Sequence, residues 1–402
     1  MNPVRNPFSA GAGVQPPELA GRQPLLARAD VMLERLRLGR SAKSFVAVGL
    51  RGVGKTVLLN RVRDLAERSD CTPIFIEAHE QKTLPELLVP SLRQLLLDLD
   101  RLGAVSEQVK RGLRVLRSFM SGVKLRYGEA ELSLGVDPER GSADSGDLEA
   151  DLPELFIAVG KAAASRGATV VLIIDELQYL SERDMSALIM ALHRVVQNNL
   201  PLALVAAGLP QVVGLSGRSK SYAERLFDFP PLDALPHDDA VRALDLPVKA
   251  EGAEFDAQAL AEIVRVTKGY PYFLQEWGYH AWNLAPSNLI RLSDAQAASD
   301  LAVQRLDESF FRVRFDRLTP REKDYLRAMA EIGPGPHRSG DIAVALGIRV
   351  QSVGPLRSAL ITKGMIYSPA HGDTAFTVPL FDEFLRRTMP VWHTPYKKQQ
   401  AP

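Results

Sequence analysis

The stretch Gly49-Leu50-Arg51-Gly52-Val53-Gly54-Lys55-Thr56 decides the fold of this chain. It fits the pattern G-x-x-x-x-G-K-[ST], in which a glycine-rich turn connects a β-strand to a helix. A short apolar run (45–48) precedes it, and a segment of helical periodicity (57–67) follows it. Glycines allow backbone N–H groups to turn toward phosphates without a Cβ atom in the way. The stretch therefore predicts a phosphate-binding loop in an α/β domain.

The pattern also assigns roles to individual residues of the loop. Lys55 is expected to reach the β- and γ-phosphates of a nucleotide, and the hydroxyl of Thr56 is expected to bind Mg²⁺. The helix that follows begins at the phosphates, where the positive end of its dipole favours negative charge. The predicted nucleotide-binding residues are Gly49, Arg51, Gly52, Val53, Gly54, Lys55, Thr56 and Val57.

A pair of acids, Asp175 and Glu176, follows the apolar run 170–174. The carboxyl end of a buried parallel strand is where an α/β sheet places its ligands. We expect Asp175 to bind Mg²⁺ and Glu176 to orient or deprotonate the attacking water. The alternative is that Glu176 only caps the next helix. Two adjacent acids favour ATP hydrolysis over a kinase or GTPase, and the sequence has no Asn-Lys-x-Asp motif to read guanine.

Four short apolar runs alternate with helical segments in the first half of the chain, which predicts parallel strands covered on both faces. The strands are expected at 45–48, 73–76, 170–174 and 202–206, and the helices at 57–67, 84–102 and 181–196. The fold class is therefore α/β. The predicted organisation is an extended arm (1–17), a P-loop ATPase core (18–235), a helical lid (236–311) and a C-terminal domain (312–402).

An insertion at 101–151 interrupts the core. Residues 101–126 hold seven Lys or Arg and one acid, with apolar residues at helical spacing, which predicts a basic amphipathic helix. Residues 123–136 alternate as in a β-hairpin that turns at Gly128-Glu129, and 141–151 is a polar, acidic loop. The insertion is either a solvated surface element or a contact for DNA or a partner.

Composition excludes several classes of protein. With 49 Lys and Arg against 48 Asp and Glu over 402 residues, the net charge of +1 excludes a wholly basic nucleic-acid coat. A single cysteine, Cys71, excludes a disulfide framework and a Cys-rich zinc or iron–sulfur site. No apolar run has the length of a membrane span, and residues 1–13 lack the apolar core of a secretory signal. We therefore expect a cytoplasmic protein.

With these motifs, the chain resembles the AAA+ and STAND branch of P-loop ATPases, in particular the initiator-like (origin-recognition-like) ATPases. Gly21-Arg22 is similar to the box that lies over the adenine, and Gly269-Tyr270-Pro271 to the GxP motif whose proline packs near the base. The resemblance implies ATP and Mg²⁺ as cofactors. It also implies that Arg225 is an arginine finger or nucleotide sensor, and hence that ATP-bound subunits assemble.

The chain departs from this family at two positions. Residues 207–211 lack the Asn or Thr expected after the strand, and Gln211 is the nearest polar substitute. The region 236–311 has Gly-Tyr-Pro in place of the usual second-sensor arginine. Both departures suit a slow ATPase that works as a switch.

The C-terminal residues 312–402 resemble the winged-helix domain that follows the lid in initiator-like ATPases. Thr319 and Glu322 form a capping box at one helix start, and two further helices (339–347 and 350–364) have helix-turn-helix order. A turn at Gly372-Asp373 predicts the wing. The expected DNA-contacting residues are Arg349, Gln351, Ser352, Arg357 and Lys363. His371 at the wing tip is interpreted as a minor-groove contact or as a solvated histidine.

Three functions fit this pattern. The first is an ATP-binding, slowly hydrolysing protein that binds duplex DNA according to its nucleotide state, supported by the 15 Lys and Arg against 10 Asp and Glu of residues 301–402. The second is a STAND-like signalling or defence switch, whose winged helix packs on protein and which works with a separate effector. The third is a helper ATPase of a mobile element.

Overall fold

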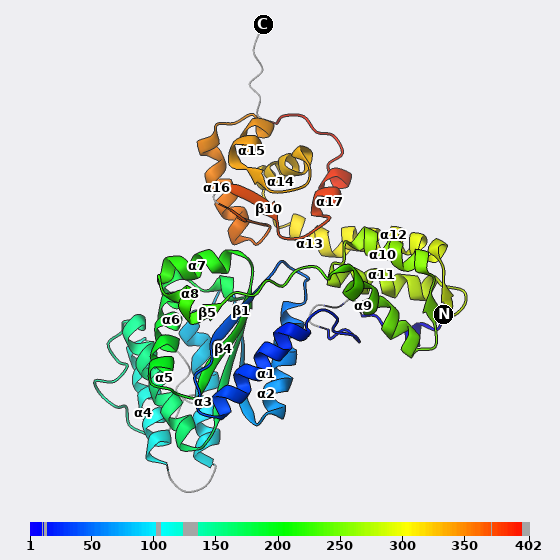
Figure 1. Cartoon of the computed structure of the whole chain (residues 1–402). Coiled ribbons are helices and arrows are strands. Elements are labelled where there is room, and N and C mark those ends of the chain that lie inside the picture. The colour runs from blue at the N-terminus through cyan, green and yellow to red at the C-terminus, as the bar shows by residue number, and fades with distance from the viewer. Residues whose placement is uncertain (10, 12–13, 102–105, 124–135, 371, 396–402) are drawn as a thin grey trace. The chain divides into compact units, whose positions relative to one another are not determined.

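The computed structural model describes residues 1–9, 11, 14–101, 106–123, 136–370 and 372–395. The chain forms two compact units. One, here called the sheet unit, comprises 22–49 and 55–232, and the other, the helical unit, comprises 1–21, 50–54 and 233–402. The elements of both are labelled in Figure 1.

The sheet unit is built on a five-stranded parallel sheet with the order β2-β3-β4-β1-β5. Its strands are β1 (Ser44–Val48), β2 (Cys71–Glu77), β3 (Thr169–Asp175), β4 (Leu202–Gly208) and β5 (Phe227–Asp228). This confirms the predicted α/β fold with a parallel-sheet P-loop NTPase core. The register pairs Val48 with Gly208 and Ile174 with Ala206, so β1, β3 and β4 end at one edge.

Helices cover both faces of this sheet, with α1 and α2 on one face and α3, α5 and α6 on the other (Figure 1). The apolar runs that predicted the strands are buried on both sides, which is what a parallel sheet requires. The helices are α1 (Gln23–Arg37), α2 (Lys55–Arg68), α3 (Leu84–Arg101), α4 (Glu107–Gly122), α5 (Leu148–Ser165), α6 (Glu182–Gln197), α7 (Gln211–Ser219) and α8 (Ala223–Leu226).

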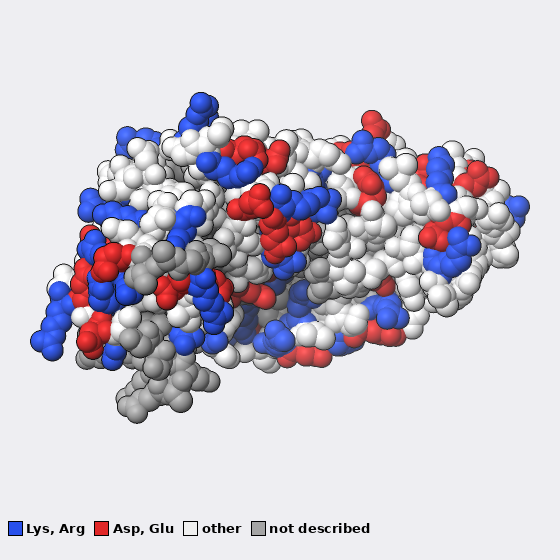
Figure 2. All heavy atoms as spheres, turned by 90° about the horizontal axis from the view of Figure 1, so that it is seen from below, with Lys and Arg blue, Asp and Glu red and all other residues white. Residues whose placement is uncertain are grey.

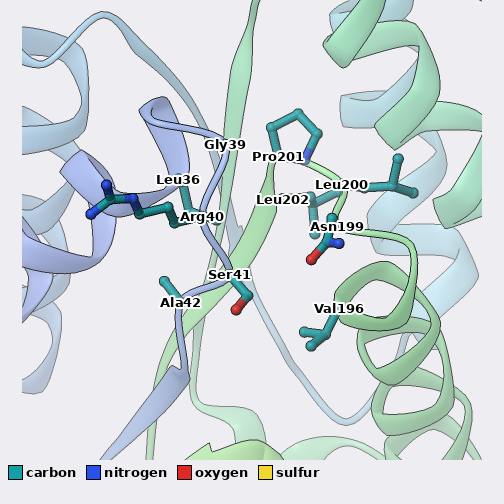
Figure 3. A pocket seen from close by; sticks show the side chains of 10 residues that line it. All are labelled: Leu36, Gly39, Arg40, Ser41, Ala42, Val196, Asn199, Leu200, Pro201 and Leu202. Atoms are coloured by element: carbon teal, nitrogen blue, oxygen red, sulfur yellow. The ribbon is translucent and has the colours of Figure 1, made fainter.

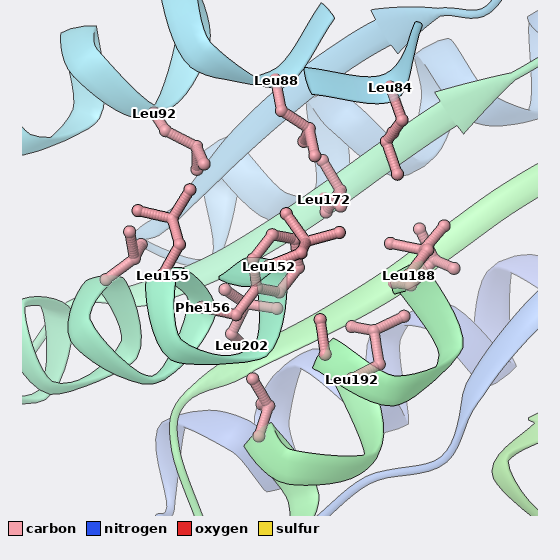
Figure 4. Packing of buried hydrophobic residues seen from close by; sticks show 14 of the residues in the cluster. Leu84, Leu88, Leu92, Leu152, Leu155, Phe156, Leu172, Leu188, Leu192 and Leu202 are labelled. Carbon is pink, nitrogen blue, oxygen red and sulfur yellow. The ribbon is translucent and has the colours of Figure 1, made fainter. Parts of the chain in front are cut away.

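The main core lies between the sheet and the helices α3, α5 and α6, and leucine is its most frequent residue (Figure 4). Phe156 of α5 and Leu172 of β3 are almost fully buried there. Helix α5 was not predicted: its first turn, which begins at Leu148, lies in the stretch 141–151 that sequence analysis interpreted as an acidic loop. Asp147 caps this helix by accepting a hydrogen bond from the N–H of Glu149 (3.2 Å), so the acidic residues there belong to a helix start.

The predicted basic helix is α4, and its apolar face is part of the core. Phe119 is fully buried, and α4 packs against α3 and α5. Its cations have local partners: Arg111 and Arg114 form ion pairs with Glu139, at 3.0 and 3.6 Å. The helix is thus a layer of the sheet unit, and two of its four cations are paired with acids. The predicted hairpin with its turn at Gly128-Glu129 lies outside the described residues.

The helical unit begins with the N-terminal arm, which packs on helix α11 (Pro271–Leu284). Phe8 is buried against Gly278, where an added Cβ atom would lie 2.8 Å from the phenyl ring. The indole of Trp282 donates a hydrogen bond to the carbonyl of Asn2 (2.9 Å). The other elements of this part are η1 (Pro3–Arg5), α9 (His237–Ala250), α10 (Ala257–Thr267), α12 (Leu292–Arg305), β6 (Glu254–Phe255) and β7 (Leu289–Ile290).

The C-terminal module, residues 306–388, packs around a cluster of phenylalanines. Phe311 lies 5.5 Å from Phe381 and 5.3 Å from Phe384, measured between ring centroids. The three short strands pair antiparallel in the order β8-β10-β9. The elements are η3, a π-helical turn (Leu306–Phe311), α13 (Arg312–Phe315), α14 (Pro320–Ile332), β8 (His337–Arg338), α15 (Ser339–Leu346), α16 (Val350–Thr362), β9 (Ile366–Tyr367), β10 (Asp373–Phe376) and α17 (Phe381–Thr388). The winged-helix interpretation of this module stays a prediction.

Glu322 stabilises the module from the first turn of α14. Its carboxylate accepts hydrogen bonds from the N–H of Thr319 (2.7 Å) and from the ammonium of Lys363 (2.7 Å). Burial alone would raise the pKa of Glu322, but the bonds from Lys363 and Thr319 outweigh it, and the pKa is lowered. A carboxyl group whose pKa is lowered by folding stabilises the protein above its unfolded pKa, and this contribution is lost as the pH falls through the folded pKa.

Replacing Glu322 by Gln should therefore lower the free energy of unfolding of the module by about 1 kcal/mol at pH 7. The difference should shrink only as the pH falls below the usual range of a Glu carboxyl, because folding lowers the pKa and the wild-type carboxylate is protonated only there. Urea unfolding of both proteins at about pH 7 and about pH 3 measures this, with Asp316→Asn at an exposed position as the control. A difference that does not change with pH would contradict the prediction.

Candidate functional site

The glycine-rich loop connects the end of β1 to the start of α2. Gly52 and Gly54 have φ values of 86° and 92°, in the left-handed region that only glycine adopts without strain. Gly49 extends the edge of the sheet, because its N–H donates to the carbonyl of Gly208 (3.0 Å). Lys55 is 5% exposed and begins α2, so the backbone N–H groups of the first helical turn point out of the helix end. This is the geometry of a loop that binds phosphate through its backbone.

The two predicted Mg²⁺ ligands are in direct contact. The hydroxyl of Thr56 donates to Oδ2 of Asp175 at 2.6 Å, and the N–H of Glu176 donates to Oδ1 of Asp175 at 2.8 Å. Asp175 is 2% exposed. Burial raises the pKa of this carboxyl group, and the hydrogen bond from Thr56 only partly opposes that shift. The sheet therefore holds a costly buried carboxylate at the edge where the loop lies.

These donors fit Mg²⁺. In the part of the chain that the structure describes, no three His, Cys, Asp or Glu residues are grouped to hold a metal by themselves. Mg²⁺ prefers oxygen ligands and is commonly bound by one or two carboxylates, with phosphate oxygens and waters completing the shell. Thr56 and Asp175 would therefore hold the ion together with the phosphates of a nucleotide.

Glu176 lies next to this pair in a left-handed conformation, with φ 53° and ψ 39°. Its side chain makes no capping hydrogen bond to the turn that follows, η2 (Leu177–Tyr179), and helix α6 is capped by Ser181 instead. The capping alternative for Glu176 is therefore wrong. Its carboxylate oxygen Oε2 accepts a hydrogen bond from the amide of Gln178.

Gln178 contacts the acidic pair, although none of the sequence motifs includes it. Besides its bond to Glu176, its amide oxygen accepts a hydrogen bond from the N–H of Leu209 (2.9 Å), just after β4. The predicted polar substitute at this edge, Gln211, has an amide oxygen that is buried without a hydrogen-bond partner among the described residues. The only sequence signal for Gln178 was its position two residues after the acidic pair.

Three predicted site residues lie elsewhere in the two units. Arg22 is buried just before α1, and Arg225 is exposed on α8, two residues before β5. Pro271 is the first residue of α11. Gly269, two residues earlier, has φ 69°, and a Cβ atom there would lie 2.3 Å from the carbonyl oxygen of Leu235. The glycine of the Gly-Tyr-Pro motif is thus required by a close backbone contact within the helical unit.

Residues 50–54 of the loop make contacts inside the helical unit. The hydroxyl of Tyr270 donates to the carbonyl of Arg51, and the N–H of Tyr272 donates to the carbonyl of Gly52 (3.2 Å). The N–H of Arg51 also donates to the carbonyl of Thr377 (3.3 Å), which follows β10. Burial raises the pKa of Tyr270 far above its usual value, so the phenol remains a hydrogen-bond donor.

Comparison with known proteins agrees with this geometry. The AAA ATPase domain family matches residues 18–205. A second family, a domain of unknown function (DUF8462), matches residues 308–385. No curated protein sequence matches the chain.

Solved structures are similar to this chain at low sequence identity. The Walker-type ATPase PABY2304 of Pyrococcus abyssi has a TM-score of 0.57 at 18% identity, over 92% of this chain and 97% of that one. Cdc6p of Pyrobaculum aerophilum is similar with a TM-score of 0.47 at 14% identity, over 96% and 99% of the two chains. ORC1 of Aeropyrum pernix in complex with DNA has a TM-score of 0.45 at 17% identity, over 92% and 94%.

A small hollow in the sheet unit lies at the opposite end of the strands from the loop, near the first residues of β1 and β4 (Figure 3). It is lined by residues 36, 39–42, 196 and 199–202, and its volume is about 10 Å³. That is room for about one water molecule and far less than a nucleotide needs. The site of interest is therefore the loop edge of the sheet.

The five predicted DNA-contacting residues lie on α16 or at its two ends and fall into two groups. Arg349, Gln351 and Ser352 are exposed at the start of the helix. The guanidinium of Arg357 donates to the hydroxyls of Thr374 (2.9 Å) and Ser368 (2.7 Å), and Lys363 binds Glu322. The last two cations therefore stabilise the module itself. His371 lies outside the described residues.

Charge on the molecule is evenly mixed on the face that Figure 2 shows, where Lys and Arg alternate with Asp and Glu. Over the described residues, no helix combines the length and the apolar character needed to cross a bilayer.

Replacing Asp175 by Asn should stabilise the nucleotide-free protein by about 0.5–2 kcal/mol at pH 7, because it removes a buried charge. The amide can still bond to Thr56 and to the N–H of Glu176. Hydrolysis of ATP with Mg²⁺ should fall by at least about 10²-fold. Thermal unfolding and phosphate release measure the two effects, with Glu67→Gln, an exposed acid on α2, as the matched control. A lower melting temperature for the Asn variant would contradict the prediction.

Proposed function

We propose that this chain binds ATP, hydrolyses it slowly and changes its association with duplex DNA according to the nucleotide it holds. One observation carries the ATPase part: the hydroxyl of Thr56 and the carboxylate of Asp175 meet at 2.6 Å, directly beside Glu176 and the glycine-rich loop. A Mg²⁺ ion held by these two side chains and a carboxylate beside it would supply what hydrolysis needs beyond phosphate binding.

Each residue of the site would have a separate role in ATP binding and hydrolysis. The backbone of the loop and the ammonium of Lys55 would bind and neutralise the phosphates, and Thr56 and Asp175 would hold Mg²⁺, which supplies further positive charge to the phosphoryl group. Glu176 would orient the attacking water and accept its proton. Arg225, exposed and with no ion pair among the described residues, would act on ATP bound by a second copy, so ATP would favour assembly.

Two further features support slow turnover and nucleotide switching. The end of β4 offers Ala207, Gly208 and Leu209, which have no polar side chain to contact a nucleotide. Hydrogen bonds from Tyr270 and Tyr272 to the loop carbonyls tie residues 51 and 52 to α11. If the conformation of the loop differs between ATP and ADP, these hydrogen bonds would transmit the difference to α11.

The DNA part of the proposal rests on the first turn of α16. Arg349, Gln351 and Ser352 are exposed at its start, where side chains of a recognition helix reach phosphates and base edges. Residues 301–402 also carry an excess of basic residues, 15 against 10 acids. The expected cofactors are ATP and Mg²⁺, and the expected partner is duplex DNA.

A second function, a switch that packs on protein, is favoured by two exposed valines, one on α15 and one in the first turn of α16. Val344 of α15 is 79% exposed and Val350 of α16 is 53% exposed. Two of the five candidate cations and polar groups, Arg357 and Lys363, are engaged within the module. An exposed apolar surface of this kind suits a protein partner, such as a separate effector or a second copy.

Replacing Lys55 by Ala tests the ATPase part. Loss of this ammonium should reduce hydrolysis by about 10²–10³-fold, since it removes the cation expected at the β- and γ-phosphates. Phosphate release and binding of a fluorescent ATP analogue measure the effect, and circular dichroism checks the fold because Lys55 is buried. Lys161→Ala, at an exposed position on α5, is the control. Unchanged turnover in the Lys55 variant would exclude the mechanism.

Replacing Arg349 by Ala separates the two functions. If α16 contacts phosphates, the variant should bind duplex DNA more weakly and the salt dependence of binding should decrease by about one unit of slope. Gel shifts at several salt concentrations, with and without ATP, measure this against wild type and Lys161→Ala. No shift by the wild type even at low salt would favour the protein-packing switch. In that case Val344→Asp should reduce ATP-dependent assembly, as light scattering would detect.

A further inference from the structure

Gln178 connects the hydrolytic edge of the sheet to β4 by two hydrogen bonds from one side chain. Its amide N–H₂ donates to Oε2 of Glu176, and its amide oxygen accepts from the N–H of Leu209 at 2.9 Å. Leu209 is 1% exposed, so its N–H would have no water to bind if Gln178 were absent. The second bond therefore fixes the amide in one orientation, with the donor group facing Glu176.

Gly208 makes room for this side chain. A Cβ atom at position 208 would lie 3.1 Å from the amide oxygen of Gln178, closer than side-chain atoms normally approach. The same residue accepts the hydrogen bond from Gly49 at the start of the phosphate loop (3.0 Å). The end of β4 thus touches both the loop and, through Gln178, the carboxylate of Glu176.

We propose that Gln178 is a positioning residue, which holds the carboxylate of Glu176 in place for water activation and ties its position to the end of β4. The inference rests on the proposed ATPase function. Glu176 has a left-handed backbone and no capping contact, so its own backbone does little to fix the side chain. The bond from Gln178 occupies Oε2 and leaves Oε1 as the oxygen for the attacking water. Residues 207–209, at the end of β4, have no polar side chain, and the amide of Gln178 supplies a polar group at this place.

The two functional groups of Gln178 can be removed separately. Gln178→Glu keeps an oxygen that accepts from Leu209, but it loses the donor to Glu176. Gln178→Ala loses both. Gly208→Ala leaves both groups but displaces them through the added Cβ atom. Gln197→Ala, at an exposed glutamine at the end of α6, is the matched control.

Steady-state ATP hydrolysis gives kcat and KM for each variant, and binding of mant-ATP gives the affinity for nucleotide. Misplacing a catalytic group by about 1 Å costs up to about 10²-fold in rate. We expect Gln178→Glu and Gln178→Ala to lower kcat by about 10- to 100-fold, while KM and mant-ATP affinity stay within about twofold of the wild type. Gly208→Ala should show the same pattern with a smaller loss, and Gln197→Ala should match the wild type.

A double-mutant cycle tests whether Gln178 acts through Glu176. In the Glu176→Gln background, Gln178→Ala should cause no further loss of kcat, because the group that it positions is already gone. Wild-type kcat in Gln178→Glu would overturn the inference and leave Gln178 as an anchor for Leu209 alone. A loss that persists in the Glu176→Gln background would also overturn it. No ATP hydrolysis by the wild type would overturn the proposed function itself, and this role with it.

Discussion

The hydrogen bond between Thr56 and Asp175 is the contact on which the site depends. Thr56 stands in the first turn of α2 and Asp175 at the end of β3, two elements separated by more than a hundred residues of sequence. The bond can form because the parallel register brings the ends of β1, β3 and β4 to one edge of the sheet. It also satisfies a carboxylate that burial makes unfavourable. The free-energy cost of burying the Asp175 carboxylate is offset by the leucine-rich core of the sheet unit, which keeps the strands in register.

Much of the site at the carboxyl ends of the strands could be predicted from the sequence, because the residues of a phosphate-binding loop have a fixed spacing. The loop, its glycines and the acidic pair follow one another along the chain, and the strands read as continuous apolar runs. Gln178 could not be found in that way. Its partner at Leu209 is 31 residues distant, and the contact depends on where β4 ends and on the missing Cβ atom of Gly208. Helix α5 was missed for a related reason, since an acidic first turn is as typical of a loop as of a helix start.

The number of basic residues was a poor guide to nucleic-acid contacts, because it does not show which acids pair with those residues. Arg111 and Arg114 of α4 lie beside Glu139, and Arg357 and Lys363 are bound within the C-terminal module. Glu139, Thr374 and Glu322 belong to other segments of the chain than the cations that they contact. Such pairs are hard to predict because their members are distant along the sequence. Arg349, in contrast, is exposed at the start of a helix, as the sequence predicts.

The docking of the N-terminal arm on α11 sets an order of events during synthesis. Asn6 bonds to the carbonyl of Tyr279 across 273 residues of sequence, and the whole sheet unit is encoded between the two partners. At about 5–20 residues per second, a ribosome needs roughly 15–50 s to make that span. Residues 1–9 therefore leave the ribosome long before their binding surface exists. The sheet unit can fold in the meantime, and the arm can dock only after α11 has been made.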